Sequence, residues 1–158
     1  MIILVPLLWI SLVLVPLSTQ MTSAQTDRPI GVALLLDNSS ELEPRRSAHR
    51  QAHLDFTRAL RAGDLVEVVE FSNPVVVRHK FTSNAAELEH TIVKSPPPSG
   101  SALYDAILKG IRDLDKLRSQ PEWDARPLVL VVFSGGHDFS SRISAPQLLA
   151  IARNRAAL

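Results

Sequence analysis

Residues 30–41 read Ile-Gly-Val-Ala-Leu-Leu-Leu-Asp-Asn-Ser-Ser-Glu, an apolar run that ends abruptly in polar residues. A run without polar alternation is typical of a strand buried on both faces, as in a parallel sheet. Residues 128–133, Leu-Val-Leu-Val-Val-Phe, repeat this pattern and are followed by Ser-Gly-Gly. The two segments predict neighbouring central strands, each with a polar loop at its carboxyl end.

The segments around these two strands alternate in type. Residues 65–71 and 75–81 are rich in valine and are joined by Ser-Asn-Pro, which predicts a hairpin whose second strand, bearing Arg78 and Lys80, lies at an edge. Apolar residues at helical spacing predict helices over residues 44–62, 85–93, 102–118 and 145–157. We therefore expect an α/β fold: a Rossmann-like three-layer α/β/α sandwich with a mostly parallel sheet and one antiparallel edge strand.

Composition excludes several function classes. The chain has 158 residues, a formal net charge of +1 and no cysteine. The absence of cysteine excludes disulfides, thiolate zinc sites and a cysteine nucleophile. A near-neutral charge argues against nucleic-acid binding, and 5% aromatic residues leave few stacking platforms.

The N-terminal segment predicts export. Residues 1–24 carry no charged side chain, and residues 2–17 are almost entirely apolar. The run is shorter than the roughly 20 residues of a membrane-spanning helix, and Thr22-Ser23-Ala24 suits a signal peptidase. We interpret residues 1–24 as a signal peptide and residues 25–158 as one domain. An uncleaved anchor is the alternative, since no basic residue precedes the run; both interpretations place the domain outside the cytoplasm.

Oxygen-bearing side chains gather at the expected carboxyl edge of the sheet. Asp37, Ser39 and Glu41 follow the first strand at alternate positions, and Ser101 comes just before the predicted long helix. Ligands of open α/β sheets bind outside the carboxyl ends of the strands. Carboxylate and hydroxyl oxygens are the ligands of a hard cation such as Mg²⁺. We therefore propose these four residues as ligands of Mg²⁺ or another divalent cation.

These motifs resemble the von Willebrand factor type A (VWA) domain, in particular its exported bacterial members, over residues 28–157. The family's metal-ion-dependent adhesion site combines Asp-x-Ser-x-Ser, a separate Thr and a separate Asp-Gly. Asp37 and Ser39 match the first motif, in which Glu41 replaces the second Ser. Ser101 stands at the Thr position, within Gly-Ser-Ala-Leu-Tyr-Asp-Ala-Ile, and Gly135 stands at the Asp position.

The resemblance implies a non-enzymatic binding module that docks an unknown protein ligand at the top of the sheet. An acidic side chain of that ligand would complete the coordination of the cation. Gly135 and Asp138 are neighbouring loop positions, and Asp138 either reaches the cation or caps the loop. Because the family has further strands after residue 133, the resemblance also implies a domain that lacks its last strands, which leaves residues 128–133 at an edge.

Two alternatives remain open. The first is a structural or assembly domain whose metal site is vestigial, with Asp37 and Ser39 serving only the loop backbone. The second is a serine hydrolase using Ser134, although the Gly that a nucleophile elbow needs two residues earlier is replaced by Val132. His49 and His53 stand four residues apart, but Arg50 lies where a zinc protease carries Glu, so we expect a partly solvated helix edge.

Overall fold

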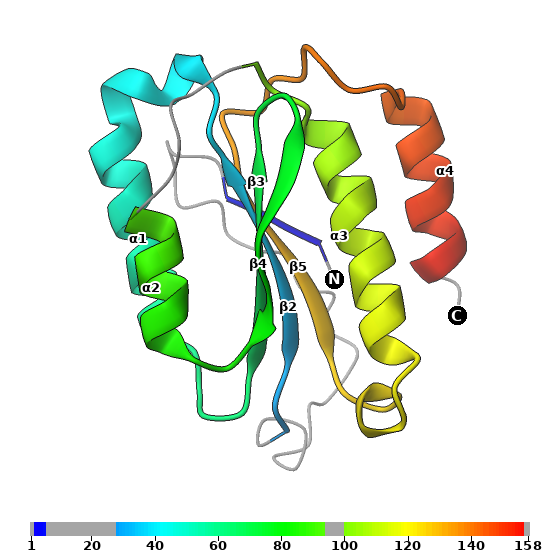
Figure 1. The fold of residues 1–158 in the computed structure, drawn as a ribbon. Helices are drawn as coiled ribbons and strands as arrows, with labels where there is room; N and C mark the ends of the chain where they lie inside the picture. The colour runs from blue at the N-terminus through cyan, green and yellow to red at the C-terminus, as the bar shows by residue number, and fades with distance from the viewer. Residues whose placement is uncertain (1, 6–27, 94–99, 157–158) are drawn as a thin grey trace, which may run out of the picture.

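The computed structural model describes residues 2–5, 28–93 and 100–156 of the chain. These residues form a five-stranded sheet in the order β1-β5-β2-β3-β4 (Figure 1). Neighbouring strands run parallel except for the antiparallel pair β3–β4. The predicted mostly parallel sheet with one antiparallel edge strand is therefore confirmed. The strands are β1 (Ile2–Val5), β2 (Gly31–Asp37), β3 (Leu65–Phe71), β4 (Val75–Thr82) and β5 (Leu128–Phe133).

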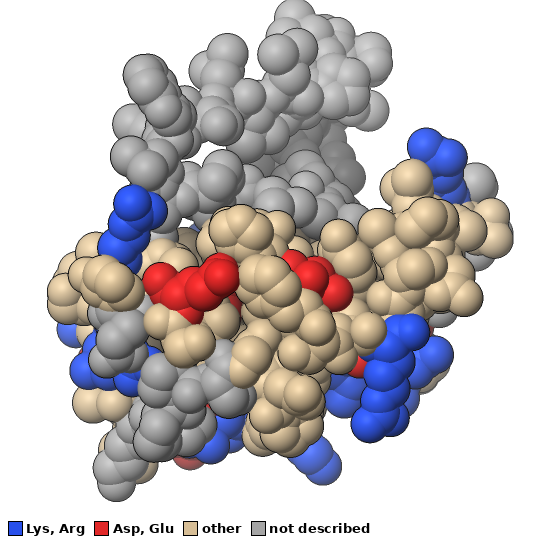
Figure 2. Space-filling model, turned by 90° about the horizontal axis from the view of Figure 1, so that it is seen from above, with Lys and Arg blue, Asp and Glu red and all other residues tan. Residues whose placement is uncertain are grey.

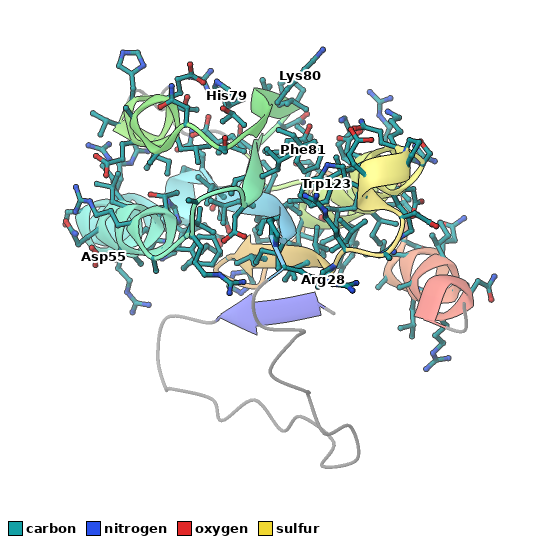
Figure 3. The ribbon with its side chains drawn as sticks, turned by 90° about the horizontal axis from the view of Figure 1, so that it is seen from below. Arg28, Asp55, His79, Lys80, Phe81 and Trp123 are labelled. Carbon is teal, nitrogen blue, oxygen red and sulfur yellow. The ribbon has the colours of Figure 1, made fainter. Side chains whose placement is uncertain are left out.

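Helices cover both faces of this sheet, which confirms the three layers. Seen from below, α1 and α2 lie on one side of the strands, and α3 and α4 lie on the other (Figure 3). Within the described ranges, none of the helices is long and apolar enough to cross a membrane. The helices are α1 (Arg46–Arg58), α2 (Ala85–Val93), α3 (Leu103–Arg118) and α4 (Ala145–Ala156), with short 3₁₀ helices η2 (Ser40–Arg45) and η3 (Pro121–Trp123).

Strand β2 lies between two hydrophobic clusters. Ala33 and Leu35 face α3, whereas Val32, Leu34 and Leu36 face the layer that contains α1 and α2. Every residue of β2 is buried. This two-sided burial explains why the strand lacks polar alternation. Strand β4 places Val75, Val77 and Phe81 against the α3 cluster, whereas His79 and Thr82 contact Glu87 of α2.

The structure corrects the expectation that β5 is an edge strand. Strand β5 pairs with β2 on one side and with β1 on the other, in a parallel register that places Ile2 opposite Leu130. The outer edge of β5 is thus covered by four residues of the segment that the sequence assigns to a signal peptide. Residues 6–27, including the predicted cleavage position, lie outside the described residues, so the signal peptide stays a prediction.

Two further details differ from the sequence expectations. The helix predicted over residues 44–62 is divided into the 3₁₀ helix η2, which contains Pro44, and the shorter helix α1. The polar residues around Trp123, at positions 120–126, suggest a lid or an exposed contact. Trp123 is instead buried, because its ring covers the start of β2 at Gly31. Residues 95–100, Ser-Pro-Pro-Pro-Ser-Gly, predict a stiff loop, and they lie outside the described residues except for Gly100.

Candidate functional site

Asp37 connects the carboxyl ends of two adjacent strands. Its carboxylate is almost fully buried and accepts three hydrogen bonds. Oδ1 accepts from the backbone N–H of Ser39 at 2.9 Å, and Oδ2 accepts from the Ser134 hydroxyl at 3.2 Å and the Gly135 N–H at 3.0 Å. These contacts exist because β2 and β5 are neighbours, with Leu36 opposite Phe133. Asp37 therefore holds the start of the loop that follows β5.

Ser101 holds the middle of the same loop from the N-terminal end of α3. Its hydroxyl, buried with the rest of the residue, donates to the backbone oxygen of His137 at 2.8 Å. Its own backbone oxygen accepts from the N–H groups of Phe139 and Ser140, both at 2.9 Å. The structure thus joins Asp37 and Ser101 through residues 134–140.

Asp138 caps α3. Its Oδ1 accepts from the backbone N–H of Tyr104 at 3.1 Å and from the hydroxyl of Ser141. A carboxylate at this position satisfies a free N–H of the first helical turn and lies at the positive end of the helix dipole. Asp138 therefore caps helix α3 rather than the loop, and a contact between Asp138 and a cation stays a prediction.

Glu41 lies on η2 and faces His137. Its Oε2 is 3.0 Å from Nδ1 of His137, and both side chains are largely exposed. Among the described residues, no three His, Cys, Asp or Glu side chains lie close enough to hold a metal ion together. Among the described residues, Glu41 makes no hydrogen bond with Asp37 or Ser39, and cation binding by Glu41 stays a prediction.

The remaining oxygen atoms are candidate ligands for a cation that keeps part of its water shell, and cation binding by them stays a prediction. Asp37 Oδ1 retains a lone pair, and the Ser39 hydroxyl makes no hydrogen bond within the described part of the chain. The Ser101 hydroxyl uses its proton toward His137, which leaves its oxygen available. Mg²⁺ is usually held by one or two carboxylates together with several waters. Asp37, Ser39 and Ser101 carry oxygen atoms of this type, and the first two residues also line one small cavity, whose lining does not include Ser101.

Gly135 marks the place of the carboxylate that the VWA pattern has and this chain lacks. A Cβ atom built on Gly135 would lie 3.9 Å from Asp37 Oδ2 and 3.4 Å from the side chain of Leu42, in ordinary contact with both. An acidic side chain at this position would therefore stand beside Asp37. Seen from above, acidic side chains lie in the middle of this face and most Lys and Arg side chains lie toward its margin (Figure 2), an arrangement that favours a cation.

Two buried histidines support the loop from below, which corrects the expectation of a solvated helix edge. His49 and His53 of α1 are both almost fully buried. The ring of His53 packs edge-on against the ring of Phe133, with 4.8 Å between the ring centroids. Burial lowers the pKa of both, that of His53 to about 3, so His53 is neutral at pH 7. A cavity of about 30 Å³ beside them and Asp37 has room for a water molecule.

Known structures share this architecture. The vWF domain of the type V pilus tip protein Mfa5 from Porphyromonas gingivalis matches with a TM-score of 0.58 and 15% identity over 75% of this chain and 43% of that one. The hypothetical protein BatB from Bacteroides thetaiotaomicron matches with a TM-score of 0.64 and 16% identity, over 80% of this chain and 62% of that one. An aerotolerance-related membrane protein from Bacteroides fragilis matches with a TM-score of 0.64 and 17% identity, over 81% of this chain and 62% of that one.

The structural matches establish the fold. No family model and no curated protein matches the sequence. The chain spans less than two thirds of the length of the solved structures named above. Because several of the matching structures are VWA domains, the chain has a VWA-like fold, as the sequence resemblance predicts.

Proposed function

We propose that this chain is an extracytoplasmic, non-enzymatic binding module that docks a protein partner at the upper edge of its sheet. A divalent cation, Mg²⁺ or a similar ion, would be held there by Asp37, Ser39 and Ser101, with Glu41 as a further ligand after release from His137. An acidic side chain of the partner would complete the coordination. The carboxylate then links cation and partner, so that each increases the affinity for the other.

One observation carries this proposal: the buried carboxylate of Asp37 accepts the backbone N–H of Ser39, and the Ser39 hydroxyl has no hydrogen-bond partner in the described part of the chain. Serine hydroxyls this close to a buried strand end normally serve the local backbone. A hydroxyl left without such a bond is available as a ligand. The VWA-like fold supports the same placement, at the carboxyl ends of adjacent strands.

A purely structural role for Asp37 is the alternative, and the hydrogen bonds of its carboxylate favour it. Its three hydrogen bonds already tie β2 to the loop after β5, and a vestigial site would keep these bonds without binding a cation. The hydrolase alternative has less support. The hydroxyl of Ser134 donates to Asp37 and accepts from the Gly136 N–H, and Ser134 is 3% exposed.

Calorimetric titration of Mn²⁺ and Mg²⁺ into the purified chain separates the two roles. We expect saturable binding to the wild type, and loss of that binding in Ser39→Ala, which keeps all three hydrogen bonds of Asp37. Asp37→Asn serves as a second variant, with circular dichroism to verify its fold. Absence of saturable heat in folded wild-type protein would support the structural role and contradict the proposal.

The partner's carboxylate is tested with a simple probe. N-acetyl-aspartate amide carries one side-chain carboxylate and no other charge. We expect its presence at saturating concentration to tighten Mn²⁺ binding by the wild type, because the two ligands are linked. N-acetyl-asparagine amide is the matched control. Equal Mn²⁺ affinity with both compounds would show that a bound cation does not recruit an acidic side chain.

A further inference from the structure

An open groove of about 740 Å³ lies between α3 and α4, and its lining includes none of the candidate cation ligands. Helix α4 lies beside α3, away from the centre of the sheet (Figure 1). Much of the groove is apolar, with Leu108 from α3, Ile143 from the segment before α4 and Ile151 from α4. A volume in this range is typical of binding sites in proteins.

Two arginine side chains line the groove. Arg112 on α3 and Arg142 before α4 are exposed, and their guanidinium groups make no ion pair or hydrogen bond with any residue in the described ranges. The other charged groups nearby are already engaged. Lys109 pairs with Asp113, and the Asp105 carboxylate accepts the backbone N–H groups of Arg142 and Ile143 at 3.1 and 3.2 Å. The groove therefore combines an apolar lining with two available guanidinium groups.

This combination defines the chemistry of an occupant. A guanidinium group pairs with a carboxylate through two parallel hydrogen bonds, and such pairs gain strength beside a surface from which water is displaced. The apolar residues suit an aliphatic or aromatic side chain. Because the groove is open rather than enclosed, it suits a stretch of polypeptide better than a small molecule that needs to be surrounded.

We propose that the α3–α4 groove binds an acidic protein segment, which places an apolar side chain against Leu108 and Ile151 and carboxylates on Arg112 and Arg142. The site is independent of the cation site. A charge reversal at the two arginines should therefore change the sequence that the groove selects and leave cation binding unaltered.

The probe is a library of random dodecapeptides displayed on phage and selected against the full chain. We expect the wild type to enrich peptides in which apolar residues are flanked by Asp or Glu. The double variant Arg112→Glu/Arg142→Glu should lose at least tenfold of this enrichment and select Lys or Arg instead. The matched control Lys80→Glu/Arg153→Glu changes two exposed basic residues outside the groove by the same total charge, and it should select the wild-type sequences.

Two further measurements complete the test. Asp37→Asn should retain the acidic consensus, which distinguishes this site from the cation site, and thermal unfolding verifies that each variant is folded. A folded wild type that enriches no acidic consensus overturns the proposal, as does a consensus that survives charge reversal. Cosedimentation with phosphatidylglycerol vesicles that requires Arg112 and Arg142, without a peptide consensus, would replace the protein segment with an anionic membrane surface.

Discussion

Replacing Glu67 by Gln should remove a large part of the pH dependence of this protein's stability between mildly acidic and neutral pH. Glu67 of β3 and Asp113 of α3 are both buried, and their carboxyl groups are hydrogen-bonded to each other. Lys109 and Lys116 both donate to Asp113, whereas Glu67 Oε2 has no partner. Two carboxyl groups share a hydrogen bond only when one of them is protonated, and this distribution of partners places the proton on Glu67.

The structure also indicates the size and sign of the effect. Burial, followed by the nearby charge of Asp113, raises the pKa of Glu67 from 4.5 to about 7. Although burial of Asp113 acts in the other direction, hydrogen bonds from Lys109 and Lys116 lower the pKa of that group. Among the described residues, the charged groups that act on Glu67 all come from α3, since β2 places Ala33 opposite Glu67 and Val77 and Phe81 of β4 pack in the same layer.

A raised pKa in the folded state means that folding favours the protonated acid. The contribution of Glu67 is therefore fully present below its unfolded pKa of 4.5 and is lost as the pH rises through about 7. The difference between the folded and unfolded pKa values of Glu67 corresponds to at most about 3 kcal/mol in the free energy of unfolding. The lowered pKa of Asp113 acts in a separate window, since its contribution is lost only as the pH falls below its ordinary value of 3.8.

The assay is urea unfolding of wild type and Glu67→Gln at several pH values from about 4.5 to about 8. We expect similar free energies of unfolding at the acidic end, and a Gln variant that is more stable by up to about 3 kcal/mol at the basic end. Titrating groups away from Glu67 contribute equally to both proteins, and the contribution of its partner Asp113 changes only below the assayed pH range, so the difference isolates Glu67. The exposed Glu122→Gln is the control, with a curve parallel to the wild type. Parallel curves for wild type and Glu67→Gln would refute the shared-proton argument.

Three further predictions concern the loop and the core. Gly135→Asp should tighten Mn²⁺ binding in calorimetry by about tenfold, about 1.4 kcal/mol, because the new carboxylate stands beside Asp37; unchanged affinity would argue against a cation at Asp37. Ser101→Ala should cost about 1 kcal/mol in urea unfolding, since it removes the bond to the His137 carbonyl; a loss no greater than that of the exposed Ser119→Ala would contradict this role. Gly110→Ala should cost about 1–3 kcal/mol in the same assay, because its Cβ would lie 2.5 Å from Leu130 Cδ1; wild-type stability would show that the core yields there.

Much of the fold is predictable from the sequence. The bounds of β3, α2 and β5 agree with the predicted segments, and α3 differs by one residue. These elements have strong local patterns, because burial on one or two faces imposes a period on the apolar residues. The N-terminal strand β1 is not predictable in this way. Its four residues belong to a longer apolar run with no pattern that marks them as a strand. They form a strand because they pair with the otherwise open edge of β5.

The candidate site shows the same division. The sequence indicates which loops meet, since the carboxyl ends of parallel strands lie at one edge of a sheet. It does not indicate how the polar groups are distributed among partners. Glu41 pairs with His137, and Asp138 caps α3. The burial of His49 and His53 is equally hidden, although their spacing on one helix face beside Phe56 is a signal that could have placed them in the core.

The sequence was therefore sufficient to predict the three layers, the antiparallel edge strand β4 and the loops that meet, because each follows from the periodicity of neighbouring residues. Contacts across the folded molecule decide what those loops hold. The bond between Ser134 and Asp37 joins residues 97 positions apart, and no local pattern specifies it. It forms because β5 enters the sheet beside β2, and that adjacency determines which oxygen atoms of Asp37 are occupied and which remain for a ligand.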